Sequence, residues 1–395
     1  MSQKDDDKKS SRIFYFDYLR LFIIGLVVFL HALLPHVKDY DWYINSSQLG
    51  DLHTLLALHI DVFIMPIMFF VAGYFSYPSL VKRGIKSFLY SKVKRILLPF
   101  IAGLTLFSPI MSYLGLLANT EMSPSYAKFW TTIYFSEFLK PAHYWFLSSL
   151  FFFYLTFSLI YYFYQDQIKD FYDQKLEMIK ERKDLLLLSF FVIGILLFFI
   201  VGLFSPDGSW ISLFNIFSFQ PTRWTIYLLY FYLGIFAYLT KLKLTVGILA
   251  RLKQFIALSI ILSVAYLAFK ITFISSLSNS LLLQLINAGL HFGLCFSIFI
   301  TLLLFFKKYF NQPSSLLNRL ASQSYRIYFF HMVIVVLIQY LLRGVGFSIY
   351  LKTIITFISS SILTYLLSEI YTAGYQKLID LSSSVALNKQ KSSEY

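Results

Sequence analysis

Charged residues are scarce in this sequence. Only 14% of its 395 residues are Asp, Glu, Lys or Arg, whereas 58% are hydrophobic and the mean hydropathy is +0.66. In a water-soluble domain roughly a quarter of the residues are charged, so this composition excludes a water-soluble protein. The apolar residues also gather in blocks of about twenty, the length that crosses a hydrocarbon core of roughly 30 Å as a helix. The sequence therefore predicts a multi-pass membrane protein.

Cysteine is almost absent. The single Cys295 lies inside an apolar block, which excludes a disulfide framework and any metal site built on several cysteines. Neither the pair of His31 and His36 nor the pair of His53 and His59 has a second convergent pair of ligands at helical spacing. The sequence predicts no bound metal.

Acidic residues are outnumbered by basic ones, and the formal net charge is +14. The basic residues occupy short segments between apolar blocks instead of one amphipathic face, which argues against nucleic acid as a partner and leaves membrane lipids. Every second segment is rich in Lys and Arg, while the alternate segments hold little beyond Lys38, Lys128 and Lys140. Lys and Arg accumulate on the cytoplasmic side. We therefore expect both termini to be cytoplasmic, in a bacterial inner membrane.

The apolar blocks define the expected architecture. We predict an all-α bundle of about ten transmembrane helices. The blocks cover residues 13–34, 55–75, 96–117, 144–164, 185–204, 224–239, 255–274, 281–306, 327–342 and 349–367. We expect a cytoplasmic N-terminal segment at 1–12, one membrane domain at 13–380 and a flexible cytoplasmic tail at 381–395.

The first block contains three ionisable residues, Asp17, Arg20 and His31. Ionisable groups inside a membrane helix are costly and usually functional. Arg20 and His31 are eleven residues apart, which places them on one helix face about 16 Å apart along the axis. Asp17 is expected to pair with Arg20, three residues on. The alternative is that Arg20 extends to the membrane surface and that His31 is merely interfacial.

Six motifs in a fixed order carry a resemblance to a known family. They are FDYLRLFIIGLVVFLH (16–31), MFFVAGYFS (68–76), KVKRILLPF (92–100), HYWFL (143–147), YFYLGIFA (230–237) and SYRIYFFH (324–331). This order resembles that of the membrane-bound acyltransferase-3 family, whose first motif places an arginine eleven residues before a histidine. Within the family, the second motif and the aromatic span after HYWFL most resemble the corresponding segments of the branch of osmoregulated periplasmic glucan biosynthesis protein C. Ala72 departs from the serine usual in the family.

The resemblance implies transfer of an acetyl or succinyl group from cytoplasmic acyl-CoA to a hydroxyl group of an extracytoplasmic carbohydrate. Arg20, with Asp17 beside it, would hold the donor, because a guanidinium binds phosphate through two hydrogen bonds. His31 would be the general base, with the thioester threaded between Arg20 and His31. Asp61, which enters its span from the outside, is predicted to orient His31 or to bind the acceptor. The alternative for Asp61 is a helix cap.

The other candidate residues fall into two groups. Arg95, Arg326 and His331 are predicted to lie at the depth of Arg20 and to contact the CoA end of the donor; headgroup anchoring is the alternative for the two arginines. His143, Trp145 and Arg223 are predicted to bind the sugar, with Trp42 and Trp224 nearby.

An interfacial aromatic belt would contain the same aromatic residues without a ligand. A secondary transporter of a small polar solute is the alternative function, although such proteins commonly show related halves, which this sequence lacks. The sequence gives no oligomeric state.

Overall fold

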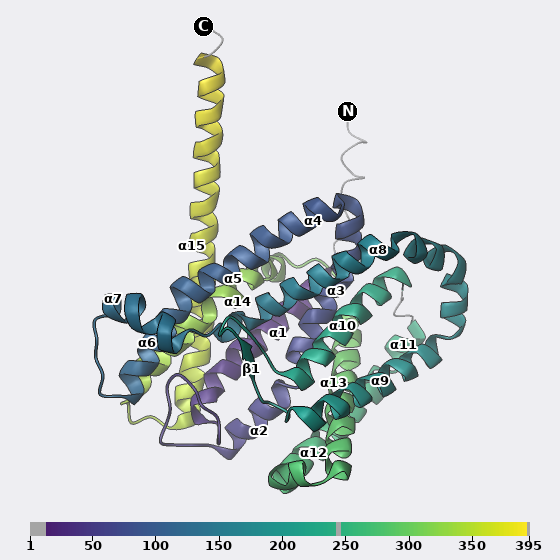
Figure 1. Cartoon of the computed structure of the whole chain (residues 1–395), viewed down its shortest axis with the longest axis horizontal. Coiled ribbons are helices and arrows are strands. Elements are labelled where there is room, and N and C mark those ends of the chain that lie inside the picture. Colours follow the sequence, from purple (N-terminus) through teal and green to yellow (C-terminus); the bar gives the residue numbers. More distant parts are fainter. Residues whose placement is uncertain (1–12, 242–245, 393–395) are drawn as a thin grey trace.

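The computed structural model describes residues 13–241 and 246–392, and these residues form a bundle of helices with one small two-stranded sheet (Figure 1). The prediction of an all-α membrane fold is confirmed. The predicted N-terminal segment, 1–12, lies outside the described residues.

The chain contains α-helices (α), short 3-10 or π-helical segments (η) and two strands (β). The first half comprises α1 (Phe14–Leu33), η2 (Leu34–His36), α2 (Asp51–Ile60), α3 (Ile64–Arg83), α4 (Ile85–Lys92), η3 (Val93–Leu97), α5 (Leu98–Ala102), η4 (Gly103–Phe107), α6 (Ser108–Asn119), α7 (Tyr126–Lys128), η5 (Phe129–Phe138), η6 (Ala142–Tyr144) and α8 (Trp145–Glu181). The second half comprises α9 (Lys183–Phe204), β1 (Ile211–Leu213), β2 (Phe217–Phe219), α10 (Pro221–Leu239), α11 (Val246–Ala250), α12 (Leu252–Phe273), η7 (Ile274–Asn279), α13 (Leu281–Tyr309), α14 (Ser315–Leu342) and α15 (Ile349–Ser392).

Within the described ranges, nine helical stretches are long and apolar enough to cross a membrane. The predicted span at 224–239 corresponds to α10, which is not among the nine. Arg223 and four tyrosines lower the hydropathy of this helix. Its 19 residues nevertheless extend about 28 Å, so α10 is long enough to be the tenth transverse helix of the bundle.

Two glycines from separate motifs make the closest helix crossing. A Cβ atom on Gly73 of α3 would overlap with the carbonyl oxygen of Phe231 in α10, and one on Gly234 of α10 would overlap with the carbonyl oxygen of Phe70 in α3. Small residues allow the backbones of membrane helices to approach in this way. The motifs at 68–76 and 230–237 therefore serve helix packing.

The start of α1 and the far part of α15 lie at the same end of the bundle. The hydroxyl of Tyr18 donates to the side-chain oxygen of Asn318 at 2.9 Å, which places the starts of α1 and α14 together. Arg319, next along α14, pairs with Glu369 of α15 at 2.7 Å. Figure 1 shows α15 extending beyond its neighbours at this end.

Three boundaries differ from the predicted ones. The second span is divided into α2 and α3 by a break at residues 61–63, and Asp61 lies in this break. Helix α14 begins at Ser315, whereas the predicted span began at residue 327. Helix α15 continues to Ser392, so residues 381–392 of the predicted tail extend the last helix.

Candidate functional site

A cavity of about 690 Å³ lies where the second half of α1, helix α2 and the middle of α14 meet η6 and the loop before β1. Its lining includes five residues that the sequence singled out: His31, Asp61, His143, Trp145 and Arg223. They come from segments far apart in the chain, and the fold brings them together at one site. The cavity is large enough for a sugar-sized ligand.

Three histidines meet at the α1 side of the cavity. Nδ1 of His31 lies 2.9 Å from Nε2 of His331, and the ring of His143 lies 4.8 Å from that of His331. His331 is fully buried in α14, and its Nδ1 lies 2.6 Å from the carbonyl oxygen of Tyr328. In the ranges that the structure describes, no group of three or more His, Cys, Asp or Glu side chains has an arrangement suited to a metal ion.

The hydrogen bonds define the tautomers of this group. A carbonyl oxygen only accepts, so Nδ1 of His331 must carry the proton that it donates to Tyr328. In the neutral ring, Nε2 of His331 is then an acceptor, and Nδ1 of His31 must donate to it. Nε2 of His31 is left with its lone pair. The arrangement therefore prepares His31 to accept a proton at Nε2.

The prediction that His331 lies at the depth of Arg20 is wrong, because His331 touches His31. The physical reason is the earlier start of α14. Sixteen residues separate Ser315 from His331, which carries His331 about 24 Å along the helix axis instead of leaving it near the first turn.

His143 is held beside this pair by unusual backbone geometry. The preceding residue, Ala142, has a φ of 48°, in the left-handed region that non-glycine residues rarely adopt. The hydroxyl of Tyr328 donates to the His143 carbonyl at 2.6 Å, and the hydroxyl of Tyr144 donates to the Phe329 carbonyl at 3.0 Å. The His143 side chain is 4% exposed, and among the described residues neither ring nitrogen has a hydrogen-bond partner of ordinary geometry. Buried nitrogens of this kind are available to a ligand.

Trp42 covers the other face of His31. The two rings are stacked 5.6 Å apart. Gln339 of α14 fixes both residues, because its amide nitrogen donates to the His31 carbonyl and its amide oxygen accepts from the Trp42 indole, each at 2.8 Å. Trp42 thus belongs to the support of His31.

In the lining of the same cavity, four charged side chains form a chain of ion pairs. Arg223 pairs with Asp61 and, at 2.9 Å, with Asp207, which also pairs with Lys270 at 3.1 Å. Asp207 and Lys270 are only 7% and 5% exposed, so each charge needs its partner. Asp61 is therefore engaged by Arg223. The partner at Nδ1 of His31 is His331, and the role of Asp61 in orienting His31 or binding the acceptor stays a prediction.

Asp207 lies in the loop between α9 and the hairpin of β1 and β2. Burial alone would raise the pKa of the Asp207 carboxyl, but the positive charges of Arg223 and Lys270 outweigh it and hold the pKa well below its usual range. The carboxylate consequently stays ionised and keeps Arg223 and Lys270 in position at the cavity wall.

An aromatic wall completes the cavity. Trp145 stacks on Tyr227 at 5.7 Å and meets Trp210 edge-on at 5.6 Å, and all three line the cavity. Trp224 does not line the cavity, and its indole nitrogen donates to the hydroxyl of Ser149. Flat aromatic faces beside hydrogen-bonding side chains suit a carbohydrate.

The predicted donor residues lie at the other end of α1. Arg20 pairs with Asp17 at 3.0 Å, as expected, and interacts electrostatically with Tyr154 of α8. Lys92 of α4 lies over the same Tyr154 ring at 3.8 Å. His31 also faces α8, because it shares the cavity with Trp145 at the start of that helix. Arg20 and His31 thus face the same neighbouring helix.

Arg95 and Arg326 are close to each other at this end. The hydroxyl of Tyr325 donates to the Arg95 carbonyl at 2.7 Å, and Arg326 is the next residue of α14. The Arg326 guanidinium donates to Gln323 at 2.9 Å and lies 5.8 Å from the Tyr371 ring centroid. The basic side chains from α1, η3, α4 and α14 are grouped away from the cavity.

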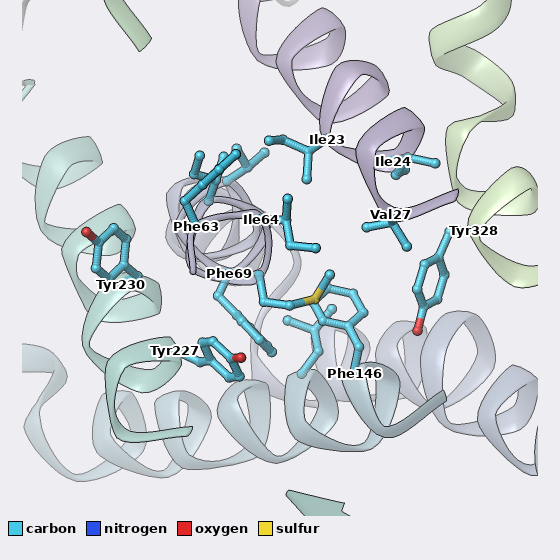
Figure 2. Close-up of a cluster of buried hydrophobic side chains, with 14 of the residues drawn as sticks. Ile23, Ile24, Val27, Phe63, Ile64, Phe69, Phe146, Tyr227, Tyr230 and Tyr328 are labelled. Atoms are coloured by element: carbon cyan, nitrogen blue, oxygen red, sulfur yellow. The ribbon is translucent and has the colours of Figure 1, made fainter. Parts of the chain in front are cut away.

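An apolar cluster lies between the basic end and the cavity. Figure 2 shows side chains of α1, α3 and α8 meeting in it, among them Ile23, Val27, Phe69 and Phe146. Ile23 and Phe69 are fully buried. The cavity reaches Val27, and Arg20 lies seven residues further, about 10 Å along the axis. The expected passage for a thioester between Arg20 and His31 is therefore closed by this cluster.

Several site residues escaped the sequence analysis. Asp207 lies in a loop outside the predicted spans, so its sequence position did not indicate a functional charge. Lys270 and Lys92 resemble ordinary lysines at helix ends. The sequence gave the least indication of a functional role for Tyr328 and Gln339, because polar side chains inside predicted spans also make ordinary contacts between helices. Only the tertiary contacts reveal their roles.

Comparison with known proteins identifies the family of the chain. The model of a family described as "Acyltransferase domain" matches residues 13–372. A search of characterised proteins finds similarity to glucans biosynthesis protein C of Escherichia coli (strain SMS-3-5 / SECEC), with 27% identity over 97 residues. The matched segment covers 25% of this chain and 25% of that protein. No solved structure matches significantly.

Proposed function

The chain belongs to the membrane acyltransferase family whose model spans residues 13–372, and from this premise we propose that it moves an acyl group from cytoplasmic acyl-CoA to a hydroxyl group of an extracytoplasmic carbohydrate. The observation that carries the proposal is the His31 site. A histidine with a free lone pair faces a cavity lined by aromatic and hydrogen-bonding side chains.

The proposed step begins with the acceptor hydroxyl beside Nε2 of His31. The hydroxyl oxygen attacks the thioester carbonyl carbon while its proton passes to Nε2. The tetrahedral intermediate then expels the CoA sulfur, and the proton on Nε2 passes to it, so that an ester and a free thiol result. His331 accepts the Nδ1 hydrogen bond of His31 throughout and stabilises the imidazolium.

His143 is assigned to the developing oxyanion. Its ring lies 6.5 Å from that of His31, and neither of its nitrogens has a good hydrogen-bond partner among the described residues. A donor placed at that point would stabilise negative charge on the former carbonyl oxygen in a cavity with little water.

The acceptor side is assigned to the cavity wall around Trp145 and Arg223. Trp145 and Tyr227 offer stacked faces, and Arg223 offers a guanidinium held by two carboxylates. The similarity to glucans biosynthesis protein C supports a glucan as the acceptor. The acyl group that we propose is acetyl or succinyl. The excess of Lys and Arg at the Arg20 end supports a cytoplasmic donor and a bacterial inner membrane.

The donor side is assigned to Arg20, Arg95 and Arg326, with Lys92 added by the structure. Cationic groups from four elements suit the phosphates of CoA. Because the apolar cluster at Ile23 and Val27 closes the path, transfer requires these side chains to move when acyl-CoA binds. Such gating by a bound substrate is common in enzymes.

The test is acyl transfer by purified full-length protein, with radiolabelled acetyl-CoA or succinyl-CoA and a soluble glucan. The His31→Ala variant is expected to lose at least about 100-fold in rate, the usual contribution of a general base. His59→Ala serves as the matched control, because His59 does not line the cavity. Wild-type transfer by properly folded His31→Ala would refute the assignment. Thermal stabilisation by free sugars and by neither acyl-CoA would instead favour a transporter.

A further inference from the structure

A second cavity, of about 420 Å³, lies beside the first at the His31 end of α1. It is formed by η2, the loop at residues 44–48, the end of α14 and the start of α15. Gln339 contributes to its wall and also donates to the His31 carbonyl. Apart from Gln339, the residues of this second cavity have no role in the proposed reaction.

Positive charge dominates the second cavity. Arg343 and Lys352 line it, and no Asp or Glu does. Among the side chains that the structure describes, no carboxylate lies within ion-pair distance of either cation. Within that part of the chain, the two cations thus have no anionic partner.

The position of Lys352 adds to this imbalance. Lys352 is the fourth residue of α15, and the first turn of that helix holds no acidic residue. A helix N-terminus carries partial positive charge, so a lysine there is unfavourable unless an anion binds nearby. The half-buried Lys352 and the helix end therefore both favour an anion at this point.

Neutral hydrogen-bonding groups surround the cations. The loop contributes Asn45, Ser46, Ser47 and Gln48, and buried Thr356 lies on the α15 side. This combination of an arginine, a lysine and several hydroxyl and amide groups matches an oxyanion with several oxygen atoms to satisfy. The cavity is also larger than a single carboxylate needs.

We propose that this second cavity binds a phosphate group, carried either by a lipid headgroup or by a soluble phosphate ester. Arg343 and Lys352 neutralise the charge, and the loop at 44–48 completes the hydrogen bonds. The bound phosphate lies against Gln339, whose other contacts hold His31 and Trp42. Occupancy is consequently expected to stabilise the support of the His31 site.

The test measures the Tm of the full-length protein in an uncharged detergent, titrated with inorganic phosphate and with glycerol 3-phosphate. A parallel series uses nanodiscs of phosphatidylcholine with and without phosphatidylglycerol. The variants are Lys352→Gln and Arg343→Gln. Lys128→Gln is the control, because this substitution also removes one positive charge, but at an exposed position that does not line the cavity.

We expect phosphate to raise the Tm of the wild type and of Lys128→Gln, and each cavity variant to weaken binding about tenfold. Stabilisation by the soluble phosphates identifies a soluble ester, and stabilisation by phosphatidylglycerol alone identifies a headgroup. Lys352→Arg retains the charge and is expected to bind, which separates loss of the site from loss of folding. No stabilisation of the wild type, or equal stabilisation of Lys352→Gln, would overturn the proposal.

Discussion

The chemistry of His31 depends on residues about 300 positions away in the chain. His331 fixes its tautomer, and Gln339 holds its backbone carbonyl. The sequence identified His31 and Arg20 because their spacing places them on one face of a single helix. It misplaced His331, because which residue of α14 meets α1 depends on where α14 begins. A difference of twelve residues in that boundary moved His331 by more than three turns.

Removing the imidazole at position 331 tests its role as a positioning residue. His331→Ala leaves Nδ1 of His31 without its acceptor, and we expect kcat to fall on the order of 100-fold with little change in the KM for acyl-CoA. His331→Gln offers an acceptor to His31 and a donor to the Tyr328 carbonyl, and should recover at least about tenfold of the loss. Steady-state kinetics provide both values. Equal losses in the two variants would indicate a purely structural role.

The buried ion pairs of the Asp207 carboxylate lead to a prediction about the free energy of unfolding. Removing one partner of a buried ion pair costs roughly 3 kcal/mol, so Asp207→Asn should lower the free energy of unfolding by about that amount at pH 7. The folded-state pKa of Asp207 is depressed, so its contribution is fully present above the unfolded pKa of about 3.9 and declines as the pH falls below that value.

Thermal unfolding at pH 7, 5 and 3.5 checks this prediction. The difference between wild type and Asp207→Asn should be equal at pH 7 and 5 and smaller at pH 3.5. A difference that already shrinks between pH 7 and 5 would contradict the depressed pKa.

At the scale of helices, hydropathy predicted about ten spans, of which nine meet the length and hydropathy of a membrane span in the described ranges, but it did not predict their internal breaks. Asp61 lies in a break between α2 and α3 that the apolar block at 55–75 concealed. Helix α10 was predicted from its apolar residues although Arg223 and its tyrosines make it the most polar of the transverse helices. Its place in the bundle is explained by tight packing against α3.

The α3–α10 crossing gives a sharp test of that packing. Gly73→Ala would place a methyl group on the Phe231 carbonyl oxygen, and backbone cannot yield as a flexible side chain does. We expect a loss of about 1–3 kcal/mol in stability, or failure to fold. Gly289→Ala in α13 is the matched control, since nothing lies within 4 Å of a Cβ atom there. Chemical unfolding in detergent compares the two, and a Gly73→Ala variant as stable as Gly289→Ala would refute the crossing.

For the whole molecule, the bundle separates a basic end from a cavity that contains the candidate base. The charge pattern predicted two such ends. The hydrogen bond from Tyr18 to Asn318 and the ion pair of Arg319 with Glu369 place the start of α1 and the part of α15 around Glu369 at the same end of the bundle. The closed apolar cluster between the ends was not predictable from the sequence, because it is formed by residues of several helices that individually look like ordinary lipid-facing or core residues.

The central claim is that the acyl group crosses from the Arg20 end to the His31 cavity, and acyl transfer in sealed vesicles of known orientation tests it most directly. Inverted membrane vesicles would contain a soluble glucan in the lumen, with radiolabelled acyl-CoA supplied outside. We predict labelled glucan in the lumen for the wild type, none for His31→Ala, and none in right-side-out vesicles that receive acyl-CoA from outside. Equal labelling in both vesicle orientations, or labelling only of glucan on the same side as acyl-CoA, would contradict transfer across the bundle.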